Sequence, residues 1–99
     1  MNKEIVKHYG IEAQLDMCME ECGELIQACN KVKRADGIGY ATYTMPDEAQ
    51  DKLIEEMAHV QNTILSLCFL MEIGQCELDA EIKRSDEQTV KKYNECKNK

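Results

Sequence analysis

Residues 17–28, Met-Cys-Met-Glu-Glu-Cys-Gly-Glu-Leu-Ile-Gln-Ala, carry three carboxylates in a segment that otherwise has the composition of a buried helix. At 3.6 residues per turn, Glu24 is a surface neighbour of both Glu20 and Glu21. Like charges at these spacings repel one another, and a purely structural helix gains nothing from them. A bound divalent cation turns that repulsion into attraction, because hard cations take carboxylate oxygens as ligands. The stretch therefore predicts a helix that carries a cation site.

The rest of the chain predicts an all-α protomer of four helices. One Pro and five Gly in 99 residues leave long uninterrupted segments, which favours helices over a sheet of short strands. A short helix is expected over residues 2–9, with Ile5, Val6 and Tyr9 inward and Gly10 at its end. The expected long helices cover residues 11–34 and 46–73. A C-terminal helix is expected over 77–94, with Leu78, Ile82, Val90 and Tyr93 as its apolar face and residues 91–99 frayed.

Both long helices carry an apolar seam whose members alternate in steps of three and four. Two such seams on consecutive helices predict an antiparallel pair. Glu21 and Glu24 flank the first seam, and Glu56 and His59 flank the second, so that pairing brings the four side chains together. Taken singly, the glutamates are expected to be solvated surface groups, and His59 a polar residue at the edge of the core that is satisfied by a helix neighbour. Taken together, the four match the ligand sets that bundles build between helices. The seams are Leu15, Cys18, Cys22, Leu25, Cys29 and Val32, and Leu53, Met57, Val60, Ile64, Leu67 and Met71.

Length and charge limit the partners that the chain can have. Residues 1–99 are expected to form a single domain, near the lower size limit for a sizeable core, and its two seams exceed what one chain can cover. This predicts a homo-oligomer, a dimer or a tetramer. The net charge of −7 counts against nucleic-acid polymers and anionic membranes as partners. No run reaches the roughly 18 apolar residues of a membrane span, and the first residues lack the apolar run of a signal peptide.

The six cysteines show no CxxC pair and predict free thiols in a cytoplasmic protein. Cys18, Cys22 and Cys29 share one helical face, where they are expected to act as small buried hydrophobes, while Cys96 is expected to be exposed. A zinc site built from Cys18, Cys22 and a His is the alternative.

Residues 35–45 are expected to form a loop. Its Gly37-x-Gly39 lacks the Lys-Ser/Thr that completes a phosphate loop. Tyr40 and Tyr43 either pin the loop to the domain or stack on a base, and the first function is the commoner one. Thr44 stands where the N-cap of the following helix belongs.

The two acidic motifs resemble those of the MazG-like superfamily of all-α nucleoside triphosphate pyrophosphohydrolases. The resemblance covers residues 5–85 and rests on Glu20-Glu21-Cys22-Gly23-Glu24, followed after about 30 residues by Glu55-Glu56-Met57-Ala58-His59. It implies a metal-dependent hydrolase that cleaves a nucleoside triphosphate between its α and β phosphates, releasing a monophosphate and pyrophosphate. It also implies a four-helix protomer that assembles into a homo-oligomeric bundle.

Carried over residue by residue, the resemblance implies that Glu21, Glu24, Glu56 and His59 bind Mg²⁺ or Mn²⁺. His59 stands where the family has Asp, and imidazole suits Mn²⁺ better than Mg²⁺. Glu20 is the candidate for positioning water or accepting its proton. Lys31 and Arg34 either contact a phosphate of the substrate or are solvated cations at a helix end. The alternative function, favoured by His59, is a helical oligomer that binds nucleotides or supports assembly with little or no turnover.

Overall fold

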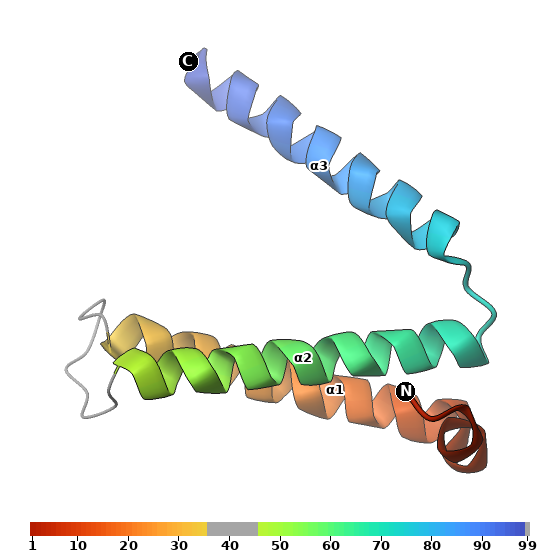
Figure 1. Ribbon diagram of the computed structural model, residues 1–99. Coiled ribbons are helices and arrows are strands. Elements are labelled where there is room, and N and C mark those ends of the chain that lie inside the picture. Colours follow the sequence, from red (N-terminus) through yellow and green to blue (C-terminus); the bar gives the residue numbers. More distant parts are fainter. Residues whose placement is uncertain (36–45, 99) are drawn as a thin grey trace.

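The computed structural model describes residues 1–35 and 46–98, which form three helices (Figure 1). Helix α1 spans Lys3–Ala35, α2 spans Pro46–Leu70 and α3 spans Gln75–Lys97. These residues contain no strand, so the all-α class is confirmed. The predictions made for Tyr40, Tyr43 and Thr44 fall outside the described residues.

Helix α1 contains two of the four predicted helices, joined by a kink at Gly10. The backbone of Gly10 has φ 84° and ψ 177°, a conformation essentially restricted to Gly. A Cβ built at this position has nothing within 4 Å, so Gly is required by its backbone conformation and not by crowding. The predicted stop at Gly10 is therefore present as a kink, and the helix count is three instead of four. Asn2 caps the first turn of α1: its Oδ1 accepts hydrogen bonds from the backbone N–H groups of Glu4 and Ile5, at 3.1 and 3.2 Å.

Helices α1 and α2 lie side by side and antiparallel, as the two seams predicted (Figure 1). The side chains buried between them are mainly small or polar, and small side chains let two helix backbones approach closely. The hydroxyls of Thr63 and Ser66 donate to carbonyl oxygens of their own helix, at 2.7 and 3.1 Å, so their burial leaves no hydrogen bond unmade. We call these buried residues the inner face of the hairpin: Gln14, Ala28, Ala49, Glu56, Thr63 and Ser66.

Several members of the predicted seams are not buried, and for them the prediction was wrong. Met57, Ile64 and Met71 are 47%, 37% and 48% exposed. They recur every seven residues, close to two helical turns, and so follow one line along α2 and the residue directly after its end, which we call the outer stripe. On α1, Leu15 and Cys29 are likewise exposed. The reason is that the heptad pattern marks an apolar side of each helix, whereas the close contact within the chain uses the side with small residues.

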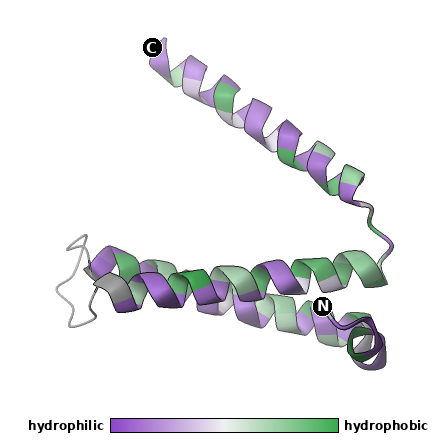
Figure 2. Ribbon diagram, in the orientation of Figure 1, coloured by the Kyte–Doolittle hydropathy of each residue, from purple (hydrophilic) through white to green (hydrophobic). Residues whose placement is uncertain are grey.

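Helix α3 leaves the end of the hairpin and extends away from it (Figure 1). It has no buried residue, and Ile82, Val90 and Tyr93 of its predicted apolar face are exposed. Figure 2 shows it as a largely hydrophilic helix with isolated hydrophobic positions. It is helical to Lys97, and the fraying expected from residue 91 stays a prediction. None of the helices within residues 1–35 and 46–98 is long and apolar enough to cross a membrane.

The turn from α2 to α3 has the form of a helix C-cap. The N–H of Ile73 donates to the carbonyl oxygen of Cys68 at 2.9 Å, and Glu72 adopts a positive φ of 57°. Helix α2 therefore ends at Leu70, three residues earlier than predicted. Gly74 is the N-cap residue before α3, and its N–H donates to the carboxylate of Glu77 at 3.2 Å.

The cysteines are present as free thiols. Cys18, Cys22 and Cys68 are half-buried, whereas Cys29, Cys76 and Cys96 are exposed.

Candidate metal centre

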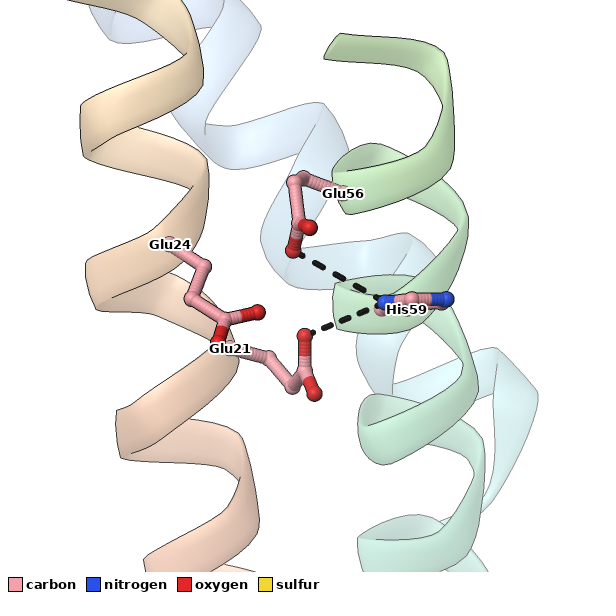
Figure 3. A group of neighbouring side chains, drawn as sticks. All are labelled: Glu21, Glu24, Glu56 and His59. Atoms are coloured by element: carbon pink, nitrogen blue, oxygen red, sulfur yellow. Dashed lines mark ion pairs between the residues drawn. The ribbon is translucent and has the colours of Figure 1, made fainter. Parts of the chain in front are cut away.

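The hairpin brings together the four residues that the two motifs predicted as metal ligands. Glu21 and Glu24 come from α1, and Glu56 and His59 come from α2 (Figure 3). Each offers one ligand atom, and these four atoms all lie within 4.8 Å of one another. On each helix the two residues are three apart, so they occupy one side of the helix, one turn after the other. The antiparallel pairing then sets the two sides against each other.

Glu56 is the most deeply buried member of this cluster. Its relative exposure is 0%, which is rare for a carboxylate. Neither of its oxygens, nor Oε2 of Glu21, makes a hydrogen bond, although both residues take part in ion pairs. A buried carboxylate with so little compensation costs free energy unless another positive charge satisfies it.

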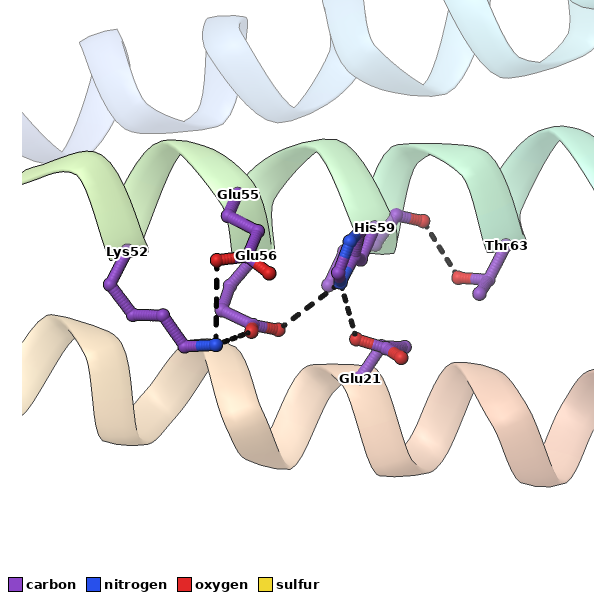
Figure 4. Close-up of polar contacts among 7 residues, drawn as sticks. Glu21, Lys52, Glu55, Glu56, His59 and Thr63 are labelled. Carbon is purple, nitrogen blue, oxygen red and sulfur yellow. Dashed lines mark hydrogen bonds and ion pairs between the residues drawn. The ribbon is translucent and has the colours of Figure 1, made fainter.

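His59 connects the two helices within the cluster. Its Nδ1 lies 3.3 Å from Oε2 of Glu21 and 3.7 Å from Oε2 of Glu56 (Figures 3 and 4). The side chain of His59 is 45% exposed, whereas that of Glu56 is 1% exposed. One nitrogen of the imidazole thus faces the carboxylates on a side chain that also reaches the surface.

The charged groups in and beside the cluster shift one another's pKa values. Repulsion by the carboxylates of Glu21 and Glu56 raises the pKa of Glu24. Contact with the Lys52 ammonium group lowers the pKa of Glu56, against the effect of its burial. The same contact with Glu56, together with Glu55, raises the pKa of Lys52. The cluster is therefore a site of concentrated negative charge with one lysine at its edge.

A pocket of about 160 Å³ opens beside the cluster. Its lining includes the acidic residues Glu24 and Glu56 and the basic residues Lys31 and Lys52. Lys31, predicted to contact phosphate, therefore lies next to the cluster, whereas Arg34 is not among the residues that line the pocket. Lys52 was missed from the sequence, although its position four residues before Glu56 was a usable signal, since residues at i and i+4 are neighbours on a helix.

The other acidic residues of the motifs lie outside the cluster. Glu20 is exposed and is not among the four converging residues. Glu55 is also exposed, and its Oε2 accepts a contact from Lys52 Nζ at 3.5 Å (Figure 4). Each Glu-Glu pair therefore divides into one residue that faces the partner helix and one that faces solvent.

The four converging residues fit a divalent cation. Three carboxylates and an imidazole are ligands that Mn²⁺ accepts, and Mg²⁺ takes the carboxylates readily. Ligands on opposite sides of a cation are two bond lengths apart, about 4.2 Å for Mg²⁺ and about 4.6–5.2 Å for Ca²⁺. The 4.8 Å spread of the cluster is slightly larger than the Mg²⁺ distance and lies within the Ca²⁺ range. Oε2 of Glu21 and Oε2 of Glu56, which lack a hydrogen bond, are the atoms that such an ion would satisfy.

The fold and the cluster define an all-α protein with an acidic centre between two antiparallel helices. Comparison with known families agrees: residues 10–99 match the model of the MazG nucleotide pyrophosphohydrolase domain. The chain belongs to this family. The comparisons matched no curated protein and no solved structure.

Proposed function

We propose that this protein is a divalent-metal-dependent nucleoside triphosphate pyrophosphohydrolase. It converts a nucleoside or deoxynucleoside triphosphate and water into a nucleoside monophosphate and pyrophosphate. The observation that carries the proposal is the convergence of Glu21, Glu24, Glu56 and His59 to within 4.8 Å. The membership of residues 10–99 in a family of nucleotide pyrophosphohydrolases supports the same reaction class.

In the proposed reaction, the oxygen of a water molecule forms a bond to the α-phosphorus. The bond from that phosphorus to the α–β bridging oxygen breaks, and its electron pair leaves with pyrophosphate. Bound Mg²⁺ or Mn²⁺ supplies charge neutralisation and orientation of the reactants, which is most of what phosphoryl transfer requires. Glu21, Glu24, Glu56 and His59 hold the cation. The proton released by water goes to solvent or to a carboxylate; Glu20, the candidate predicted from the sequence, is exposed and lies outside the cluster, so that role would need the assembled oligomer or bound substrate to bring it close.

Lys31 and Lys52 are the proposed contacts for the phosphates, because both line the pocket beside the cluster. A volume of about 160 Å³ is below the roughly 300–1,000 Å³ of typical ligand pockets. This space suits part of a triphosphate, and the base and sugar need a further surface. We propose that a second copy of the chain supplies that surface, which agrees with the exposed outer stripe and with the unburied α3.

His59 sets the expected metal preference. An imidazole in place of a carboxylate removes a negative charge and adds a nitrogen ligand, and Mn²⁺ tolerates both changes better than Mg²⁺. We therefore expect higher turnover with Mn²⁺ than with Mg²⁺, and a shift of this preference towards Mg²⁺ in His59→Asp. An unchanged preference in that variant shows that His59 is not a metal ligand.

The test is a panel of ribo- and deoxyribonucleoside triphosphates assayed for pyrophosphate release with each metal. The expected products are a monophosphate and pyrophosphate in equal amounts. Release of inorganic phosphate instead contradicts cleavage between the α and β phosphates. Nucleotide binding without any product, for every nucleotide and both metals, favours the alternative function of a nucleotide-binding or assembly module.

A further inference from the structure

Among the lysines of residues 1–35 and 46–98, Lys52 is distinguished by its contact with a buried carboxylate. Its Nζ lies 3.0 Å from Oε1 of Glu56, whose side chain is 1% exposed, while the lysine side chain itself is 47% exposed (Figure 4). An ion pair between two exposed groups contributes little, because water competes for both charges. Here one partner is removed from water, and loss of the ammonium group leaves a buried carboxylate poorly compensated.

The two oxygens of Glu56 have different neighbours. Oε1 is the atom in contact with Lys52, and Oε2 is the atom nearest His59, at 3.7 Å. Lys52 and His59 lie on opposite sides of Glu56 along α2, four residues before it and three residues after it. A contact at each oxygen restricts the rotation of the carboxylate about its last bond. With Oε1 held by Lys52, Oε2 is directed at the cluster formed with Glu21 and His59 (Figures 3 and 4).

From this geometry we propose that Lys52 is a positioning residue for the metal centre: it holds Glu56 in the orientation that presents Oε2 to the cation. The inference rests on the proposed function, since it requires Glu56 to be a metal ligand. It goes beyond it by assigning to a lysine at the edge of the cluster a role in binding a cation. Groups that orient a metal ligand in this way typically change metal affinity by about 10–100-fold when they are removed.

The proposal and a simple electrostatic effect predict opposite changes in cation affinity when Lys52 loses its charge. Removing a positive charge near a cation site strengthens cation binding if charge alone matters, because like charges repel. Removing a group that orients a ligand weakens cation binding. The variant Lys52→Met therefore separates the two effects by the direction of its change in affinity.

Lys31→Met is the matched control. Lys31 lines the same pocket as Lys52, so both variants remove one positive charge from that region. No ion pair links Lys31 to Glu56 among the contacts of the described residues. The control therefore measures the effect of charge without loss of the Glu56 contact.

The experiment is a titration of the purified full chain with Mn²⁺ in the absence of nucleotide, followed by calorimetry and by the electron paramagnetic resonance signal of free Mn²⁺. We expect the affinity of Lys52→Met to fall by about 10–100-fold. Lys31→Met is expected to bind Mn²⁺ as tightly as the wild type or more tightly. Lys52→Arg keeps a cation within reach of Glu56 and is expected to recover most of the affinity. Circular dichroism at each titration temperature establishes that the variants remain helical.

Several outcomes overturn the inference. If Lys52→Met binds Mn²⁺ at least as tightly as the wild type, Lys52 acts through its charge alone. If Lys31→Met loses as much affinity as Lys52→Met, the contact with Glu56 is not responsible. If Lys52→Met does not fold, the test uses Lys52→Gln. A folded Lys52→Gln that binds Mn²⁺ as tightly as the wild type likewise overturns the inference. A wild type that binds no Mn²⁺ overturns the metal centre itself and with it this inference, so the two failures are distinguishable.

Discussion

The inner face and the outer stripe of the hairpin have opposite compositions and opposite environments. The inner face buries Ala28, Ala49, Thr63 and the charged Glu56, whereas the outer stripe exposes Met57, Ile64 and Met71. Burial of apolar area is the main favourable term in folding, so an isolated chain with this arrangement leaves stabilisation unused. The comparison indicates that the inner face is arranged for the acidic centre, and that the outer stripe is the apolar surface that the proposed homo-oligomer would bury.

The largest expected effect comes from Glu24→Gln on the inner side of the hairpin. It removes a proposed ligand charge without changing the shape of the side chain, and we expect turnover to fall by more than about 100-fold, the upper range for groups that only support a ligand. Glu12→Gln, at an exposed glutamate of α1 more than three turns before Glu24, is the control and is expected to keep its activity. Full activity in Glu24→Gln contradicts the metal centre.

The same variant is expected to be more stable than the wild type when a chelator is present. The raised pKa of Glu24 means that its charge destabilises the folded protein at neutral pH. That destabilisation is complete above the raised pKa and is relieved as the pH falls through it. Thermal unfolding in a chelator should therefore give a higher Tm for Glu24→Gln at pH 7, and a smaller difference from the wild type in acid. Equal Tm values at pH 7 contradict the repulsion.

Ile64→Lys tests the outer stripe. If a second copy covers Ile64, burial of its side chain is worth about 1.5–3 kcal/mol, and its loss weakens association by about 10–100-fold. Sedimentation equilibrium over a range of concentrations measures the change. Asn62→Lys, at an exposed polar position of α2 that points away from the outer stripe, is the control and should associate like the wild type. A wild type that is a stable monomer at micromolar concentration contradicts the proposed oligomer.

Gly10→Ala and Gly23→Ala should change stability in opposite directions. At Gly10 the backbone conformation is nearly closed to other residues, so the substitution is expected to lower the free energy of unfolding by about 1–3 kcal/mol. Gly23 lies inside α1 with open space around a built Cβ, so Gly23→Ala is expected to raise the free energy of unfolding by about 0.5–1 kcal/mol. Urea unfolding measures both. A loss of stability in both variants would show that space, and not backbone conformation, limits these positions.

The smallest effect is expected at the turn that separates the hairpin from α3. Glu72 has a positive φ of 57°, which costs an ordinary residue about 1–2 kcal/mol and Gly almost nothing. Glu72→Gly is therefore expected to raise the free energy of unfolding by up to about 1 kcal/mol in urea. Glu87→Gly places Gly in the interior of α3, where it is unfavourable, and should lower the free energy of unfolding by about 1 kcal/mol. If Glu72→Gly is as destabilising as Glu87→Gly, the turn is not strained.

The sequence by itself determined the helical class and the members of the acidic cluster. Few Gly and Pro residues left long helices as the main possibility, and Gly10 interrupted α1 where its lack of a side chain predicted. Glu21, Glu24, Glu56 and His59 were identifiable because spacings of three residues put each pair on one side of its helix, which is a local property of the chain. The family resemblance rested on the same two motifs, and the match over residues 10–99 confirmed it.

Only the tertiary structure decided which side of each helix meets its neighbour. The heptad pattern predicted that Met57 and Ile64 face α1, but the helices approach along Ala28, Ala49 and Thr63. Periodicity records that a helix has an apolar side; whether that side is covered within the chain or by another copy depends on contacts distant in sequence. The contact of Lys52 with Glu56 was a local possibility, yet its importance depended on the burial of Glu56, which only the packing of α1 against α2 produces.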